Sequence, residues 1–137
     1  MNSYKFFVPG EVEGKARPRM NTRTGKTYTP TKTKNYEYLI KQCFLYKYPE
    51  YKTLEGRLKV TILAGFDIPK STSKAKRKLM LEGEINPTKK PDIDNITKIV
   101  LDAMNKLAYK DDTQVILLAV SKIYVEEPGI CIEIEEF

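Results

Sequence analysis

The stretch from Lys89 to Gln114 limits the possible folds and chemistry of this chain more than any other. It begins KKPDIDNITKIVLDAMNKLAYKDD, and from about 92 to 107 its apolar residues recur at helical spacing: Ile93, Ile96, Val100, Leu101, Met104 and Leu107. Such a helix must bury its apolar stripe against another layer. Carboxylates flank the helix at both ends: Asp92, Asp94, Asp111 and Asp112. Hard oxygen ligands beside a basic remainder of the chain indicate a magnesium site that works on phosphate.

Each of these carboxylates also has an ordinary structural interpretation. Asp92 can cap the helix with its side chain, and Asp94 with Lys98 is a common exposed pair four residues apart. The Asp111-Asp112 pair is favoured in a turn before a strand. However, two carboxylates at the start of one helix repel each other, and the helix dipole offsets only about 0.3–1 kcal/mol of this. The combination therefore favours a bound cation.

The charge is divided unevenly along the chain. Residues 1–90 hold 20 Lys and Arg against 8 Asp and Glu, a net +12, whereas residues 91–137 hold 4 against 10, a net −6. A protein charged in this way can hold a polyanion while it keeps divalent cations beside it, and nucleic acid is the natural polyanion. The alternative is that the lysines only solvate the surface.

Two basic segments are candidates for DNA binding. Residues 10–30 show no period and are expected to form a long functional loop, with a disordered surface hairpin as the alternative. Tyr28 offers a face for base stacking there. Residues 70–90 are expected to include a short helix capped by Ser71 or Ser73. The basic candidates are Lys15, Arg17, Arg19, Arg23 and Lys26 in the first segment, and Lys74, Lys76, Arg77, Lys78, Lys89 and Lys90 in the second.

The other elements follow from periodicity and turn residues. We expect a helix over 31–48 capped by Thr31 or Thr33, and strands over 4–8, 58–66, 114–124 and 130–135, the last a half-exposed edge. This predicts an α/β (α+β) sandwich in which a mixed sheet of about four strands packs against helices. A single domain over 1–137 is expected at this length.

Composition excludes several classes of protein. The two cysteines form no CxxC motif, so zinc ribbons and disulfide frameworks are poorly supported. There is no apolar run of membrane-spanning length and no signal peptide, so we expect a cytoplasmic protein that is not bound to a membrane. The chain has no histidine, which excludes histidine-based nucleases. A calcium-binding EF-hand starting at Asp92 fails because Thr97 and Ala103 stand where Gly and Glu are required.

The motifs KPDIDNITKIVLDAMN and YKDDTQV resemble the RusA-type Holliday junction resolvases of bacteria and prophages. The segments VPGEVEGKARPRM and TGKTYTP also resemble phage-type members. The resemblance implies a RusA-like homodimeric, magnesium-dependent endonuclease that cuts four-way DNA junctions in recombination and repair. Mn²⁺ can substitute at such an all-oxygen site. The residues that match the family's site are Asp92, Asp94 and Asp112 as catalytic metal ligands, Asp111 in support, Lys98 as an essential basic residue, and Asp102, whose role is less defined.

One departure concerns the turn after the acidic helix. Many relatives have Gly there, whereas this chain reads NKLAY from Asn105 to Tyr109, and Asn tolerates a left-handed conformation. The sequence leaves two alternatives to a junction resolvase. One is a non-catalytic basic DNA-binding module whose aspartates only cap and solvate. The other is a nuclease that prefers flaps or duplex DNA.

Overall fold

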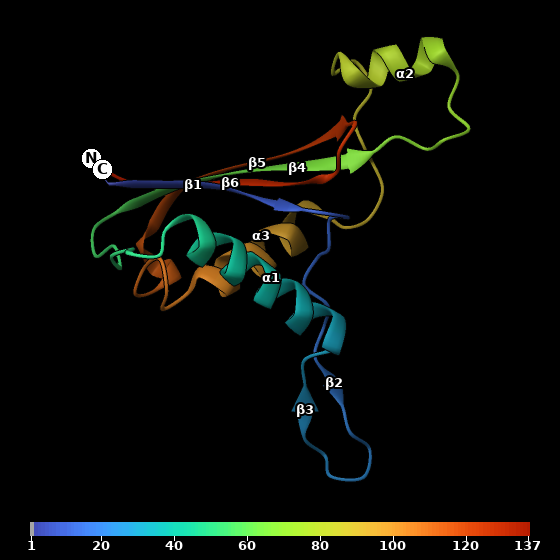
Figure 1. The fold of residues 1–137 in the computed structure, drawn as a ribbon. Coiled ribbons are helices and arrows are strands. Elements are labelled where there is room, and N and C mark those ends of the chain that lie inside the picture. Colours follow the sequence, from blue (N-terminus) through green and yellow to red (C-terminus); the bar gives the residue numbers. More distant parts are fainter. Residues whose placement is uncertain (1) are drawn as a thin grey trace.

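The computed structural model describes residues 2–137 and has two layers, a mixed β-sheet and a pair of helices (Figure 1). This confirms the predicted fold class. The elements in chain order are β1 (Ser3–Pro9), β2 (Arg19–Met20), β3 (Thr27–Tyr28), α1 (Thr31–Lys47), β4 (Leu58–Asp67), α2 (Lys74–Leu81), α3 (Ile93–Met104), the short 3₁₀ helix η1 (Asp112–Gln114), β5 (Val115–Val125) and β6 (Gly129–Glu136).

The main sheet has the strand order β1-β6-β4-β5. β6 pairs antiparallel with both β1 and β4, and β4 pairs parallel with β5. The expectation that residues 130–135 form an edge was therefore wrong, because β6 lies between two strands. Its alternating pattern reports one covered and one uncovered face rather than a free edge. The free edges are β1 and β5.

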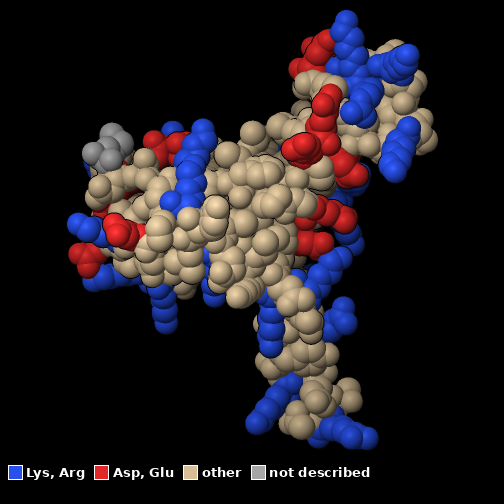
Figure 2. Space-filling view, viewed as in Figure 1, with Lys and Arg blue, Asp and Glu red and all other residues tan. Residues whose placement is uncertain are grey.

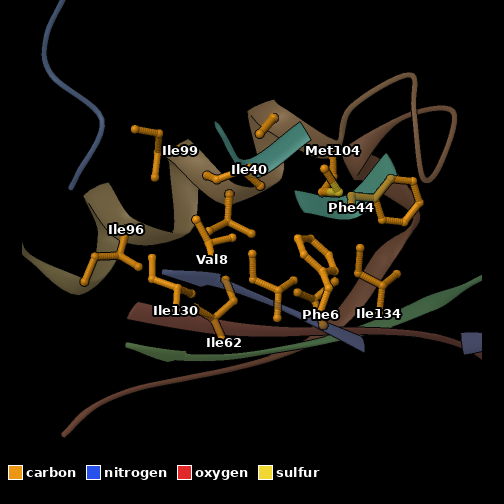
Figure 3. Packing of buried hydrophobic residues seen from close by; sticks show 14 of the residues in the cluster. Phe6, Val8, Ile40, Phe44, Ile62, Ile96, Ile99, Met104, Ile130 and Ile134 are labelled. Carbon is orange, nitrogen blue, oxygen red and sulfur yellow. The ribbon is translucent and has the colours of Figure 1, made fainter. Parts of the chain in front are cut away.

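The core lies between one face of the sheet and the helices α1 and α3 (Figure 3). Every second residue of each inner strand points into this layer, as the strand period requires. The fully buried side chains come from strands and helices alike: Val8, Ile40, Phe44, Ile62, Ile96, Ile99, Met104, Ile130, Ile132 and Ile134. Burial of each such side chain contributes about 1.5–3 kcal/mol. α3 is thereby held rigidly under the sheet, which fixes the direction of both its ends.

The start of α1 differs from its predicted cap. Pro30 occupies the N-cap position and no side chain caps the helix. Thr33 is buried, and its hydroxyl accepts a hydrogen bond from the backbone N–H of Ala16 at 3.2 Å. Its side chain is thus used for a tertiary contact with the preceding loop, which local spacing does not reveal.

Two arms leave the body at the end where α3 begins, on opposite sides (Figure 1). One is the ribbon formed by β2 and β3, which replaces most of the long loop expected over 10–30. The other carries α2, whose predicted cap is confirmed because Ser73 accepts a hydrogen bond from the backbone N–H of Lys76. The start of β1 and the C-terminus lie at the far end of the body.

The turn after α3 contains one left-handed residue, and it is Lys106 with φ 62°. Asn105, the expected position, has φ −63°. The strained position of this turn is therefore occupied by a lysine.

Cys43 and Cys131 are both unbonded thiols and are partly rather than fully buried. Within residues 2–137, every helix is too short or too polar to cross a membrane.

Candidate metal centre and nucleic-acid surface

The first two acidic candidates lie exposed at the start of α3. The backbone oxygen of Asp92 accepts the N–H of Ile96 at 3.0 Å, but its carboxylate makes no capping hydrogen bond. Asp94 lies in the first turn of α3. Within residues 2–137 it forms no ion pair with Lys98. Neither ordinary structural role is realised, so both carboxylates point to solvent at the positive end of a helix.

A loop from β1 covers this end of α3. The backbone N–H of Lys15 donates to the carbonyl of Asn95 at 2.9 Å. Gly14 approaches so closely that an added methyl group would lie 2.7 Å from the Cβ of Pro91. Between loop and helix is an open cleft of about 490 Å³ whose charged lining comprises Glu11, Glu13, Lys15, Arg17, Lys90 and Asp92.

Glu11 and Glu13 were not among the sequence candidates. Both lie on the cleft that contains Asp92, so three carboxylates border the same opening. A signal was present in the sequence, since these are the only two acidic residues among the first 36. Glu13 also forms an ion pair with Lys32 at 3.4 Å, which links the loop to α1.

Lys15 joins the loop to both core helices. Its Nζ lies 2.7 Å from Glu37 on α1 and 3.1 Å from Asp102 on α3. Burial alone would lower the pKa of Lys15, but the hydrogen bonds and negative charges of the two carboxylates outweigh it and raise the pKa. The ammonium is thus already paired, and the phosphate contact expected of Lys15 stays a prediction. Asp102, whose role the resemblance left undefined, holds this lysine.

Asp111 and Asp112 lie beyond the other end of α3 and differ from each other. Asp111 accepts from the Thr113 hydroxyl at 2.7 Å, and its backbone N–H donates to Gln114 at 3.0 Å. Gln114 in turn donates to the carbonyls of Leu54 and Gly56. Asp111 is therefore part of the turn that anchors η1, whereas the Asp112 carboxylate takes no part in the hydrogen bonds found there.

The negative charge of Asp112 is felt at Tyr109. Burial is the main cause that raises the pKa of this tyrosine, and the charges of Asp112, Asp102 and Asp111 raise it further. The Tyr109 hydroxyl donates to the carbonyl of Leu101, in the last turn of α3, at 2.6 Å. Asp112 consequently belongs to the C-terminal end of this helix.

One chain does not bring all the predicted ligands together. The 12 residues of α3 rise about 18 Å and separate Asp92 and Asp94 from Asp112. Within residues 2–137, no three Asp, Glu, Cys or His side chains are grouped as a metal site. Mg²⁺, however, is commonly held by one or two carboxylates together with substrate phosphate and water. Asp92 and Asp94 are two exposed carboxylates at the start of one helix.

The basic candidates lie mainly on the arms (Figure 2). Lys and Arg side chains project from the ribbon and from α2, and acidic side chains gather on the body between the bases of the arms. Lys89 is held against the body, with its Nζ 6.0 Å from the ring centroids of both Phe66 and Tyr124. Lys90 lines the cleft beside Asp92. Positive arms beside exposed carboxylates are suited to hold a phosphate backbone over a cation site.

Comparison with known proteins decides the family. The model of the family "Endodeoxyribonuclease RusA" matches residues 9–135. The chain belongs to the RusA family. It is also 39% identical over 140 residues to an uncharacterized Bacillus subtilis (strain 168) protein, YqaN, and the match covers 99% of this chain and 98% of that one. The resemblance to RusA-type resolvases is thereby confirmed, and it indicates endonuclease activity.

The part of the chain that matches the RusA family includes both arms. The matched region begins at Pro9, so it includes the cleft loop, the ribbon, α2 and both ends of α3. The acidic and basic candidates of this RusA protein all lie inside the matched region.

Proposed function

We propose that this protein is a magnesium-dependent, structure-selective endodeoxyribonuclease that resolves four-way DNA junctions as a homodimer, in DNA recombination and repair. The observation that carries the proposal is a pair of exposed carboxylates, Asp92 and Asp94, at the start of α3. Neither makes a capping hydrogen bond, and the two basic arms lie on either side of them. Family membership supports the reaction class.

Asp92 and Asp94 would hold the divalent ion, which when bound neutralises charge on the scissile phosphate and lowers the pKa of a coordinated water. Their aspartate oxygens suit Mg²⁺, with Mn²⁺ able to substitute. Lys98 lies one turn further along α3 and is exposed. Since it has no carboxylate partner among residues 2–137, its ammonium is available to stabilise phosphate charge.

Asp112 would join the site from a second copy of the chain. β5 begins directly after η1 at the Asp112 end and finishes at Val125. At that far end, Tyr124 lies beside Lys89, and Pro128 shares a small pocket with Lys90 and Pro91, just before α3. Two β5 edges paired antiparallel about a two-fold axis would therefore bring Asp112 of one copy toward Asp92 and Asp94 of the other.

The free edge of β5 supports this assembly. Three successive apolar residues near its start, Ile116, Leu117 and Leu118, are 56%, 51% and 46% exposed. A long apolar edge strand offers unpaired backbone groups to another strand. The same assembly gives two sites related by symmetry, as paired cuts in a two-fold junction require.

The decisive experiment compares Mg²⁺-dependent cutting of a synthetic four-way junction, a flap and a linear duplex. We expect paired nicks in the junction that stop with EDTA. Asp92→Asn, Asp94→Asn and Asp112→Asn should each abolish cutting while junction binding is kept or strengthened, because each removes repulsion of the DNA. A wild-type protein that binds junctions but never cuts would support a non-catalytic DNA-binding module, and preferential cutting of flaps or duplexes would replace the substrate assignment.

A further inference from the structure

The β2–β3 ribbon is an ordered arm that the body of the protein does not cover. All residues from 17 to 28 are exposed. Arg19 pairs with Tyr28 and Met20 with Thr27 across the two strands. The tip is closed by backbone hydrogen bonds from Asn21 to Lys26 and from Gly25 to Asn21, both 2.8 Å. The arm therefore has a defined shape even though its residues 17–28 are all exposed.

An isolated two-stranded ribbon is marginally stable in water, so a partner is expected to complete it. The sequence indicates the charge of that partner. Between residues 14 and 36 there are seven basic residues and no acidic one. Among residues 2–137, ion pairs engage Lys15 and Lys32 of that group but none of the arginines. The uncompensated charge fits a polyanion.

The two arms differ in the kind of cation they carry. α2 presents mostly lysines, which act on phosphates as point charges, whereas the ribbon presents Arg17, Arg19 and Arg23. The planar guanidinium fork can bind the O6 and N7 edge of guanine with two hydrogen bonds. A two-stranded β-ribbon also fits the major groove of B-DNA, where this edge is displayed. The shape of the ribbon and the chemistry of its arginines thus both suit contact with guanine in the major groove.

The base of the ribbon is fixed to the helix that begins with the candidate ligands. Lys15 pairs with Asp102 on α3, and its backbone donates to Asn95 on the same helix. Ala16 is bonded to Thr33 on α1. An arm that selects the cut site by contacting bases must stay at a constant distance from the scissile phosphate. The contacts of Lys15 and Ala16 fix the base of the ribbon relative to α3 and α1.

We propose that the β2–β3 ribbon enters the DNA major groove, where Arg19 and Arg23 read base edges and so determine which sequences near a junction are cut. The part that concerns cutting rests on the proposed nuclease function. The groove contact itself does not require catalysis.

The test measures methylation of bound DNA by dimethyl sulfate, which modifies guanine N7 in the major groove and adenine N3 in the minor groove. The protein carries Asp94→Asn and no metal, so the DNA stays intact. We expect protection of guanine N7 next to the branch point. Protection confined to adenine N3, or none in a bound complex, would overturn the proposal.

A double arginine-to-lysine variant separates recognition of base edges from simple attraction between charges. Arg19→Lys with Arg23→Lys keeps both charges but loses the bidentate fork. We expect affinity at low salt to change less than about threefold, while N7 protection is lost and cut-site preference among junction sequences falls by about tenfold or more. The matched control, Lys76→Ala with Arg77→Ala on α2, should weaken binding of all sequences and leave protection and preference intact.

The outcomes keep the two proposals apart. A protein that protects guanine N7 but never cuts would overturn the nuclease and leave the ribbon assignment standing. A protein that cuts junctions with unchanged site preference in the arginine-to-lysine variant would overturn the ribbon assignment alone. A protein without affinity for DNA would overturn both.

Discussion

Lys15 and Glu37 form an ion pair of 2.7 Å that ties the base of the ribbon to α1, and the same ammonium lies 3.1 Å from Asp102 on α3. The Lys15 and Glu37 side chains are only 22% and 16% exposed, so this pair is shielded from solvent more than ordinary surface pairs. The contact therefore links the arm, α1 and the acidic helix in one place.

Lys15→Met should lower the free energy of unfolding by about 1–2 kcal/mol, because two neighbouring carboxylates lose their shared cation. We also expect weaker guanine protection by the ribbon, since its base is no longer fixed. Chemical denaturation measures the first effect and methylation of bound DNA the second. The control is Lys34→Met, which removes a charge from the exposed face of α1. Equal effects of the two variants would contradict the anchoring role.

The stability difference between the wild type and Lys15→Met should depend on pH in one direction. The folded-state pKa of Lys15 lies above its ordinary value of 10.5, chiefly because the opposing effect of burial is outweighed by its carboxylate partners. Such a group contributes its full stabilisation below the unfolded-state pKa and loses it as pH rises through the folded-state pKa. We expect a constant difference from about pH 7 to about pH 9 that shrinks above about pH 10.5. A difference that grows at high pH would exclude the ion pair as its source.

Mixing two inactive variants tests whether the site is shared between chains. Asp94→Asn and Asp112→Asn should each be inactive alone. If ligands come from both copies, a mixed dimer contains one site built from two intact contributions, and the mixture should nick one strand of the junction. The measurement is nicking after the variants are denatured and refolded together. A mixture of Asp92→Asn with Asp94→Asn is the control, because it leaves no intact site in a shared arrangement. Silence in both mixtures would contradict the shared site.

Lys106→Gly should stabilise the protein. Lys106 has φ 62°, a left-handed conformation that costs a non-glycine residue about 1–2 kcal/mol, although glycine also loses more entropy on folding. We expect a net gain of about 0.5–1 kcal/mol in the free energy of unfolding and unchanged cutting. Lys41→Gly in the middle of α1 should instead destabilise by about 1 kcal/mol. A loss of stability in Lys106→Gly would mean that the lysine side chain makes a compensating contact.

The sequence predicted the elements well because their patterns are local. The helical stripe that includes Ile96, Val100 and Met104 is buried as expected, and the strand containing Ile62 lies where its apolar run indicated. The position of β6 was missed because alternation describes faces and contains no information on lateral neighbours. Thr33 was one of two candidate caps, with Thr31, because local spacing cannot show that Ala16 approaches it.

The sequence could predict which residues belong to the candidate site but not how they are arranged in space. Sequence motifs gave Asp92, Asp94 and Asp112 as candidate ligands, but their separation along α3 depends on the length and direction of the helix between them. Glu11 and Glu13 come to the cleft through a loop contact, and no periodicity encodes such a contact. The ribbon was expected as a loop because each of its strands has only two residues, too few for a detectable period.

Gly14→Ala tests whether the fit of the cleft loop on α3 matters for cutting. An added methyl group would lie 2.7 Å from the Cβ of Pro91 and 3.0 Å from the Cβ of Asn95, so the loop or the start of α3 must shift. We expect a destabilisation of about 1–3 kcal/mol and a clear fall in kcat, because the shift displaces Asp92 and Asp94. Gly25→Ala at the ribbon tip is the comparison, since a methyl group there meets nothing within 4 Å and only the left-handed φ of 69° is strained. It should cost about 1 kcal/mol or less and leave kcat unchanged. If both variants cut at the wild-type rate, the contact of Gly14 with α3 does not position the carboxylates.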